Sequence, residues 1–579
     1  MSIILSDEQS VYVKATGKII LNACPGSGKT TTVAHKLYFL IQNWGRNFSL
    51  NAGIVCLSFT NVAKNEIGEK FKEINGFSLT YPHLISTIDS FVNTYITLPF
   101  AQKVYNIGKR FRIIDDIGYI DRIFQSDWQL MKTFKKYLFA FPPSKIDFML
   151  NSSFSWDGHD KSADAEFVKY AKAVKKKQIV MGLLKTSDSA FLALHILKKY
   201  PRIAKYLAEK FPYLIIDEAQ DTSEIQHSII EILHNEGLKN IDLVGDPYQC
   251  LYQWRDASPE LFLQKFDDTV NWKGIFLTEN RRSTKKIIDV FSVLRRITDK
   301  AIIPIIDTAT DLPLHIIKYD NANYIDAISK YEKLCFDNNY ISNNILVRGN
   351  TLKNSLLGKE TNYSPWIASV PYDLIESRIH LQSNEIKEAI RKVRRIVIEL
   401  ISPEISFADL KEKEQELKND KQTNATIFNL IRGLPSFDLS LKDWTSQTQQ
   451  YLKNELELET ELDFKIRKKN TVSFDKTTLD YPVKRYFTKS ATTNNFPVTT
   501  IHQVKGMTFD SVFLILSANS KGQNISLKDF FLKEEMPTEK QRLIYVAISR
   551  PRYLLCIGVP NTIMDEELKM QFSNKIKII

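Results

Sequence analysis

The sequence contains little cysteine, and no two cysteines form a CxxC pair. An odd number of widely separated thiols argues against a disulfide framework, and the missing pairs argue against zinc and iron-sulfur clusters. This pattern favours a reducing cytosol. The cysteines are Cys24, Cys56, Cys250, Cys335 and Cys556.

Long apolar runs are also missing. No stretch approaches the roughly 20 apolar residues that a membrane-spanning helix needs. The segment from Met1 to Asp7 has too short an apolar run, and becomes acidic too soon, to be a signal peptide. We therefore expect a soluble, cytoplasmic protein without a membrane partner.

What is present is a long chain with a basic excess. At 579 residues and 43% hydrophobic side chains, it exceeds what one core usually organises, so we expect several domains. The 78 basic and 67 acidic side chains give a net charge of +11, which suits a polyanionic partner such as nucleic acid. Solubility is an alternative reason for such a charge, so sequence motifs must decide whether the partner is nucleic acid.

Short β-branched and aliphatic runs beside turn residues predict buried parallel strands. Helical patterns lie between several of them, such as the spacing of Val33, Leu37 and Leu40, so the predicted fold class is α/β. The runs form two groups, which indicates two sheets in two core domains. The first group is Ile19–Leu21, Ile54–Leu57, Leu214–Ile216 and Ile241–Val244, and the second is Ile345–Val347, Val512–Leu516 and Leu554–Ile557.

Two stretches lack this strand rhythm and are predicted to be mainly helical insertions. They run from Leu98 to Lys210 and from Pro403 to Asn495, and neither contains a repeat or a long low-complexity tract. The lysine-rich runs Lys175–Lys177 and Lys465–Lys469 could contact a DNA backbone. A solvated helix face is the favoured interpretation of both.

The segment ACPGSGKT, from Ala23 to Thr30, follows a predicted strand and precedes a predicted helix. In this context a glycine-rich turn directs backbone N–H groups and a helix N-terminus at phosphate. Lys29 would reach the β- and γ-phosphates, and the Thr30 hydroxyl would hold Mg²⁺. Gly26 and Gly28 let the backbone approach the phosphates. Ala23 stands where the generic pattern has glycine, and a chance structural turn is the disfavoured alternative.

An acidic pair at the end of a buried strand would complete a magnesium site. In the segment from Leu214 to Asp221, Asp217 would bind Mg²⁺, through water. Glu218 would orient and deprotonate the water that attacks the γ-phosphate. Such a pair is common by itself and becomes persuasive only together with the phosphate loop.

With these residues in place, the chain resembles superfamily 1 helicases of the UvrD, Rep and PcrA type. Leu5–Gln9 is similar to the Q motif, and the resemblance implies that Gln9 reads the adenine. The segment Ser58–Glu66 resembles the TFTNKAA motif, which implies that Phe59, Thr60 and Asn61 touch single-stranded DNA. In the segment Thr87–Phe91, Asp89 replaces the histidine of the family's TFHS motif.

A longer match covers Val244–Gln249 and Leu251–Ala257, which are similar to the GDxxQxIYxWRGA motif. The resemblance implies that Gln249 senses the γ-phosphate and that Tyr252, Trp254 and Arg255 face nucleic acid. Aromatic stacking is worth roughly 1–3 kcal/mol per base and tolerates any base. A core tryptophan is the alternative interpretation of Trp254.

Motifs of the second core domain follow. Asn280–Ser283 matches the NYRS motif, which implies that Arg282 reaches the γ-phosphate, and Arg550 resembles a second such arginine. Both would stabilise the charge of the transferring phosphoryl group when the cleft is shut. Thr500–Asp510 resembles the TLHSAKGLEF motif, which lies between nucleotide and DNA. The resemblance implies that His502 contacts nucleic acid and that Gly506 lies at the nucleotide. Ile345–Arg348 resembles a conserved strand.

Three departures from the family pattern affect the base and sugar of the nucleotide. Thr508 replaces the glutamate that contacts ribose, Arg281 replaces the tyrosine that stacks on adenine, and Thr31 replaces an arginine over its other face. We therefore expect intact hydrolysis with a relaxed or altered nucleotide preference. The complete predicted set for ATP is Gln9, Ala23, Cys24, Pro25, Gly26, Ser27, Gly28, Lys29, Thr30, Thr31, Arg281, Gly506 and Thr508.

The resemblance implies two RecA-like parallel-sheet domains, each with a mainly helical insertion. Residues 1–97 and 211–279 would form domain 1A, residues 98–210 insertion 1B, residues 280–402 and 496–579 domain 2A, and residues 403–495 a reduced insertion 2B. The implied function is an ATP-dependent, single-stranded-DNA-stimulated translocase or helicase, moving 3′ to 5′, in DNA repair or antiphage defence. Its cofactors would be ATP and Mg²⁺, and its partner single-stranded or tailed duplex DNA.

The short second insertion leaves a rival interpretation open. The chain is also similar to the compact GajB-like branch of the Gabija antiphage system. An ATP-gated sensor of DNA ends, which activates a partner OLD-type nuclease and scarcely unwinds, is therefore the alternative. RNA as the track is a third hypothesis. No nuclease motif follows Arg550, so any cutting would come from the partner.

Overall fold

The computed structural model describes residues 5–114, 117–125, 127–251, 257–306, 312–320, 323–356, 365–382, 385–402, 405, 410, 413–414, 416–418, 420–466, 479–484, 495–532, 536–572 and 576–579. The chain forms two compact units. The first comprises Met1–Ala322, Lys333–Asn344 and Ile501–Ile579, and the second Asn323–Glu332 and Ile345–Thr500.

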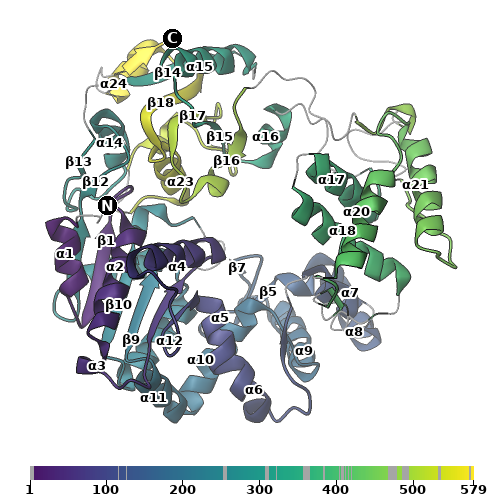
Figure 1. The fold of residues 1–579 in the computed structure, drawn as a ribbon, viewed down its shortest axis with the longest axis horizontal. Helices are drawn as coiled ribbons and strands as arrows, with labels where there is room; N and C mark the ends of the chain where they lie inside the picture. Colours follow the sequence, from purple (N-terminus) through teal and green to yellow (C-terminus); the bar gives the residue numbers. More distant parts are fainter. Residues whose placement is uncertain are drawn as a thin grey trace. The chain divides into compact units, whose positions relative to one another are not determined.

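The first unit contains a six-stranded parallel sheet in the order β11-β1-β10-β9-β2-β3 (Figure 1). Successive residues of its central strands face opposite sides, so Ile20 joins one hydrophobic core whereas Ile19 and Leu21 join the other. Burial on both faces explains the continuous apolar runs in the sequence. The strands are β1 (Lys18–Ala23), β2 (Ile54–Ser58), β3 (Leu84–Thr87), β9 (Tyr213–Asp217), β10 (Asn240–Gly245) and β11 (Lys273–Leu277).

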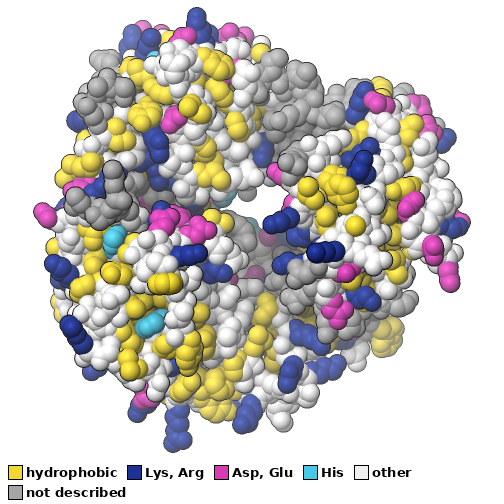
Figure 2. Space-filling view, in the orientation of Figure 1, with side chains coloured by type: hydrophobic (Ala, Val, Ile, Leu, Met, Phe, Trp, Pro, Cys, Tyr) yellow, Lys and Arg dark blue, Asp and Glu magenta, His cyan; other side chains and the backbone are white. Residues whose placement is uncertain are grey.

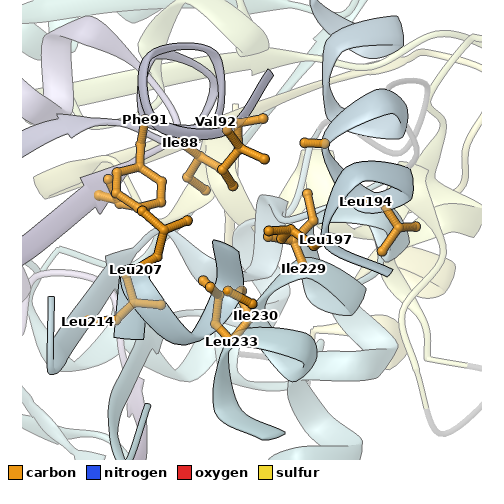
Figure 3. Close-up of a cluster of buried hydrophobic side chains, with 14 of the residues drawn as sticks. Ile88, Phe91, Val92, Leu194, Leu197, Leu207, Leu214, Ile229, Ile230 and Leu233 are labelled. Atoms are coloured by element: carbon orange, nitrogen blue, oxygen red, sulfur yellow. The ribbon is translucent and has the colours of Figure 1, made fainter. Parts of the chain in front are cut away.

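Helices cover both faces of this sheet. One core packs against α1 (Asp7–Lys14), α2 (Lys29–Gln42), α3 (Trp44–Asn47) and α4 (Asn61–Asn75). The other core packs against helices that include α5 (Ile88–Val92), α10 (Thr186–Lys199), α11 (Pro201–Lys210), α12 (Glu224–Asn235) and α13 (Pro259–Asp267). Figure 3 shows part of this second core, where Phe91, Leu197, Leu214 and Ile230 come together from four different elements.

The stretch from 98 to 210 is mainly helical, as expected, but it also holds short strands. Its remaining helices are α6 (Leu98–Tyr105), α7 (Ile117–Gln125), α8 (Trp128–Ala140) and α9 (Ala165–Val180). β5 (Ile146–Phe148), β6 (Phe154–Trp156) and β7 (His159–Asp160) form an antiparallel sheet, and β4 (Arg112–Ile113) pairs with β8 (Leu183–Leu184). Strands this short carry too few residues for a periodic signal.

A second parallel sheet includes β17, β18, β14 and β19, which lie side by side in that order within the first unit. α14 and α23 pack on it, so the α/β class with two RecA-like sheets is confirmed. The elements are β14 (Leu314–Tyr319), β17 (Phe509–Ile515), β18 (Pro551–Pro560), β19 (Ile576–Ile578), α14 (Lys285–Ser292), α23 (Glu539–Ile548) and α24 (Asp565–Gln571), with the short pair β12 (Glu279–Asn280) and β13 (Ile303–Pro304) before them.

The second unit is built on helices around Trp366 and Trp444, both fully buried. α17 and α18, which precede position 403, share this core with α20 and α21. The helices are α16 (Asn350–Leu356), α17 (Val370–Gln382), α18 (Ile386–Ile401), α20 (Lys421–Gly433) and α21 (Leu441–Glu455). β15 (Asn343–Val347) pairs with β16 (Val498–Thr500), and α15 (Ile325–Asp337) spans the unit boundary. The proposed domain boundaries stay a prediction.

In the described part of the chain, each helix is too short or too polar to cross a lipid bilayer.

Candidate active site

The carboxyl ends of the first sheet's strands bring the predicted residues to one edge. β1 ends at Ala23, where the phosphate loop begins, and β9 ends at Asp217. β10 ends at Gly245, shortly before Gln249. Since all these strands are parallel, their carboxyl ends lie at the same edge, which is where open α/β sheets bind ligands.

The phosphate loop requires glycine at two positions. Gly26 and Gly28 have φ values of +72° and +76°, a region that residues with a Cβ rarely adopt. A Cβ on Gly26 would also lie 2.5 Å from the Cβ of Arg282. The Asn280 side chain donates to the Pro25 carbonyl oxygen at 2.7 Å, so the segment that carries Arg282 is fastened to the loop.

A cavity of about 380 Å³ lies at this edge and is bordered by all six residues predicted to be catalytic. The phosphate-loop residues Ala23 to Thr31 also border it, and so does Gly506. Phe59, Thr60 and His502, which were predicted to contact nucleic acid, border it too. The six are Lys29, Asp217, Glu218, Gln249, Arg282 and Arg550.

Two lysines and three carboxylates alternate along one side of this cavity. Lys29 Nζ contacts Glu218 Oε1 and lies 3.4 Å from Asp217 Oδ1. Lys505 Nζ pairs with the Asp221 carboxylate and lies 3.7 Å from Glu218 Oε2. Burial opposes ionisation of Glu218, but the charges of Lys29 and Lys505 outweigh it and hold the pKa of Glu218 below its usual range. Glu218 is therefore ionised at neutral pH.

Burial has the opposite outcome at Asp217, where it raises the pKa of the carboxyl to about 6 although Lys29 counteracts it. Asp217 Oδ1 is buried and accepts no hydrogen bond from the described residues. Thr30 borders the same cavity. A carboxylate and a hydroxyl oxygen are ligands that Mg²⁺ accepts, so the residues fit the predicted metal.

Two arginines that follow the strands of the first sheet in the sequence also border the cavity. Arg550 is buried, and its guanidinium donates to Gln249 Oε1 at 2.7 Å and to the Val546 carbonyl oxygen at 2.8 Å. Arg282 donates to the Ser549 carbonyl oxygen at 3.2 Å. Burial lowers the pKa of Arg282 to about 10 and, with repulsion from Arg282, that of Arg550 to about 9. Two cations with neutral oxygen partners thus face one cavity, which favours an anionic ligand.

The residues predicted to contact the base and sugar of the nucleotide do not all border the cavity. The Gln9 amide group donates to the Ser27 carbonyl oxygen at 3.1 Å and accepts from the Ser6 N–H at 3.0 Å. Arg281 pairs with Glu279. Gln9, Arg281 and Thr508 are not among the described residues that border the cavity, whereas Thr31 is.

Only some of the residues predicted to contact nucleic acid are among the described residues. Tyr252, Trp254 and Arg255 lie outside the described residues. Asn61 is the exposed first residue of α4 and does not border the cavity. Asp89, at the position of the family histidine, accepts a hydrogen bond from the Gln226 side chain at 3.2 Å.

Sequence reasoning did not single out Lys505 and Asp221. Both residues lie within sequence segments that were compared with family motifs, so the sequence could have drawn attention to each of them. Their pairing was not, because it joins residues that are far apart in the chain.

Comparison with known proteins agrees with this geometry. Residues 5–270 match the UvrD/REP helicase N-terminal domain, and residues 474–562 match the UvrD-like helicase C-terminal domain. The chain belongs to the UvrD-like helicase family. The N-terminal match covers the phosphate loop, Glu218 and Gln249, and the C-terminal match covers Lys505 and Arg550.

The chain is also similar to individual curated proteins. The ATP-dependent DNA helicase PcrA of Staphylococcus epidermidis is 27% identical over 294 residues, which are 49% of this chain and 39% of the relative. The PcrA of Staphylococcus aureus is 26% identical over the same shares. The matched part of the chain thus spans well under half of the length of these relatives.

Proposed function

We propose that this UvrD-like helicase hydrolyses ATP in the cavity at the phosphate loop. The observation that carries the proposal is the pair of half-buried Arg282 and buried Arg550, whose described partners are neutral oxygens. A bound polyphosphate would give these two guanidinium groups an anionic partner. Glu218, which is ionised and borders the same cavity, would act on water.

The residues divide the work of hydrolysis. The backbone N–H groups of the phosphate loop and Lys29 bind the β- and γ-phosphates. Thr30 and Asp217 would hold Mg²⁺, which neutralises phosphate charge when bound. Glu218 orients the attacking water and accepts its proton. Because Lys29 contacts Glu218 in this structure, Lys29 must leave that carboxylate when the phosphates enter.

The two arginines would stabilise the negative charge that develops in the transition state. Arg550 donates to Gln249 at 2.7 Å, so Gln249, which would sense the γ-phosphate, is joined directly to one of them. Preorganised donors of this kind stabilise the phosphoryl group without reorganising during the reaction. Hydrolysis then depends on the segments that carry Arg282 and Arg550 and responds when they move.

We extend the proposal to movement along single-stranded DNA in the 3′-to-5′ direction, with separation of tailed duplexes. Phe59, Thr60 and His502 border the nucleotide cavity, so bound DNA would adjoin the reacting phosphates. The Staphylococcus relatives are named ATP-dependent DNA helicases, which supports DNA as the track. On the face shown in Figure 2, basic and acidic side chains are interspersed, so the charge of that face does not mark a track.

Strand release from tailed duplexes tests the proposal. Purified protein is mixed with ATP, Mg²⁺ and duplexes that carry either a 3′ or a 5′ single-stranded tail, and Glu218→Gln serves as the inactive control. The proposal expects release from the 3′-tailed duplex only, together with DNA-stimulated phosphate release. Phosphate release without strand release would favour the DNA-end sensor instead, and stimulation by RNA but not by DNA would refute the choice of track.

The cellular role that we propose is DNA repair or antiphage defence in the cytoplasm, with an OLD-type nuclease subunit as a candidate partner. The support is the resemblance of the sequence to the compact GajB-like branch, in which a helicase-like subunit works with another protein. Co-purification of such a nuclease with the native protein tests the partnership.

A further inference from the structure

Lys36 is a fully buried lysine of α2. Its Nζ donates to the main-chain carbonyl oxygen of Tyr12 at 2.8 Å and to that of Ala15. The same nitrogen lies 3.4 Å from Oδ2 of Asp242, which is a residue of β10. The other oxygen of Asp242 accepts a hydrogen bond from the Tyr213 hydroxyl at 3.1 Å. These contacts fix the Lys36 side chain at one point between α1, α2 and the first sheet.

Burial opposes the charged form of both members of the Lys36–Asp242 pair. It lowers the pKa of Lys36, an effect that Asp242 offsets in part and that the charge of Lys273 increases. It raises the pKa of Asp242, although Lys36 counteracts this. Replacement of a buried ion pair by hydrophobic side chains of similar volume is often neutral or stabilising, whereas removal of one partner is strongly destabilising. The stability of the fold therefore does not by itself explain a lysine here.

The carbonyl groups that Lys36 binds lie at the end of α1. The helix ends at Lys14, and Ala15 is its C-cap. The last carbonyl groups of a helix lack N–H partners within the helix, and a cation there also complements the helix dipole. An apolar side chain could fill the same space but could not bind these oxygens. Lys36 thus fastens the last turn of α1 to α2, which lies beside it (Figure 1).

The first half of α1 contacts the phosphate loop. Gln9 Nε2 donates to the Ser27 carbonyl oxygen at 3.1 Å, and a Cβ on Gly28 would lie 3.2 Å from the same nitrogen. The Glu8 carboxylate accepts hydrogen bonds from the N–H and the hydroxyl group of Thr278 at 2.6 and 2.9 Å. Because α1 has only eight residues, the point at which its last turn is held sets where Gln9 meets the loop.

Nucleotide binding should respond to this contact between Gln9 and the loop. Ser27 lies between Gly26 and Gly28, the two glycines with positive φ values, and the backbone N–H groups of such a loop bind phosphate. Glycine allows the backbone many conformations. A hydrogen bond that holds the loop in one of them reduces the entropy lost when the phosphates bind.

We propose that Lys36 is a positioning residue for nucleotide binding. Together with Asp242 it holds the last turn of α1, and α1 in turn holds the Ser27 carbonyl of the phosphate loop through Gln9. Lys36 itself is not among the described residues that border the cavity. The inference rests on the proposed function, because it requires that the phosphate loop binds ATP.

The test measures the Kd of a fluorescent ADP in the presence of Mg²⁺. Lys36→Met with Asp242→Asn removes both charges together, leaves no buried charge unpaired, and keeps an oxygen that can accept from the Tyr213 hydroxyl. Lys175→Met with Asp188→Asn is the matched control. Lys175 and Asp188 form a second buried pair, at 2.6 Å, and neither of them borders the cavity.

A double-mutant cycle separates positioning from a general effect on the fold. Gln9→Met is made alone and together with the change at Lys36 and Asp242, so that the cycle isolates the part of the effect that passes through Gln9. Circular dichroism and urea unfolding check that each variant is folded. Lys36→Gln with Asp242→Asn keeps one N–H donor for the carbonyl groups of α1, and the same comparisons are made with it if the methionine variant does not fold.

We expect Lys36→Met with Asp242→Asn to raise the Kd by roughly 2- to 10-fold, the equilibrium effect of one hydrogen bond of ordinary strength. The control should keep the wild-type Kd. In the Gln9→Met background the same change should leave the Kd unaltered, because the contact with Ser27 is already lost. An unchanged Kd in the folded variant, an equal rise with and without Gln9, or an equal rise in the control would refute the inference and leave the proposed function intact. Wild-type protein that binds no nucleotide would instead refute the proposed function, and the inference with it.

Discussion

Acid should destabilise this protein through one buried histidine. His227 lies in α12, the helix that follows Glu218 and Asp221, and its side chain is 2% exposed. Neither ring nitrogen has a hydrogen-bond partner among the described residues. Burial, with a smaller contribution from the charge of Lys265, lowers the pKa of His227 from 6.5 to about 3. The folded protein thus keeps this imidazole neutral.

The sign of the pH dependence follows from linkage. Between pH 6.5 and 3 the unfolded chain binds a proton at His227 and the folded chain does not, so the free energy of unfolding falls as the pH falls. The stability is fully present above pH 6.5. Each pH unit below it costs roughly 1 kcal/mol, and the complete loss is on the order of 5 kcal/mol.

A substitution isolates this contribution from those of other titrating groups. His227→Leu removes the proton site and leaves no unpaired nitrogen, so its loss of stability between pH 7.5 and 5.5 should be smaller than that of the wild type by roughly 1 kcal/mol. Exposed His159→Leu is the control. Urea unfolding followed by circular dichroism measures the difference, and hydrogen exchange in peptides from α12 shows that the transition includes this helix. Parallel losses in the wild type and in His227→Leu would refute the reasoning.

Three further predictions concern the cavity. Glu218→Gln should lower kcat for ATP hydrolysis by roughly 10²- to 10⁴-fold, the usual contribution of a general base, with nucleotide binding retained by fluorescence titration; a kcat near the wild-type value would contradict its role. Arg550→Ala should lower kcat by roughly 10³- to 10⁵-fold, as removal of an arginine finger does, and a change in KM alone, seen in steady-state phosphate release, would argue against contact with the transition state. Because the Gln9 amide and Arg281 are engaged within the protein, ATP, GTP and UTP should show comparable kcat/KM values, and Arg281→Tyr should shift the preference toward ATP; strict ATP preference in the wild type would overturn this expectation.

Much of the first sheet and of the phosphate site could be predicted because their signals are local. The turn at Gly26 and Gly28 needs residues without a Cβ, and Lys29 must follow it directly to begin α2. Strands buried on both faces leave continuous apolar runs such as Ile54–Leu57. The short strands β5, β6 and β7 lacked such a signal, because two or three residues show no period.

Contacts between site residues that are far apart in the sequence could not be predicted. Nothing near Lys505 in the sequence indicates Asp221 as its partner. The motif for Gln9 predicts that it reads adenine, and this stays a prediction. In the structure, its amide hydrogen-bonds to Ser6 and Ser27, a pairing that the motif did not indicate.

The sequence by itself determined the α/β class, the family and the types of residue that would face a triphosphate, since strand burial, glycine turns and helix starts depend on neighbouring residues. Only the tertiary structure decided that Arg282 and Arg550 meet Glu218 at one cavity and that Lys36 holds the last turn of α1. The physical reason is that charge pairing and burial act through space, where residues hundreds of positions apart become neighbours.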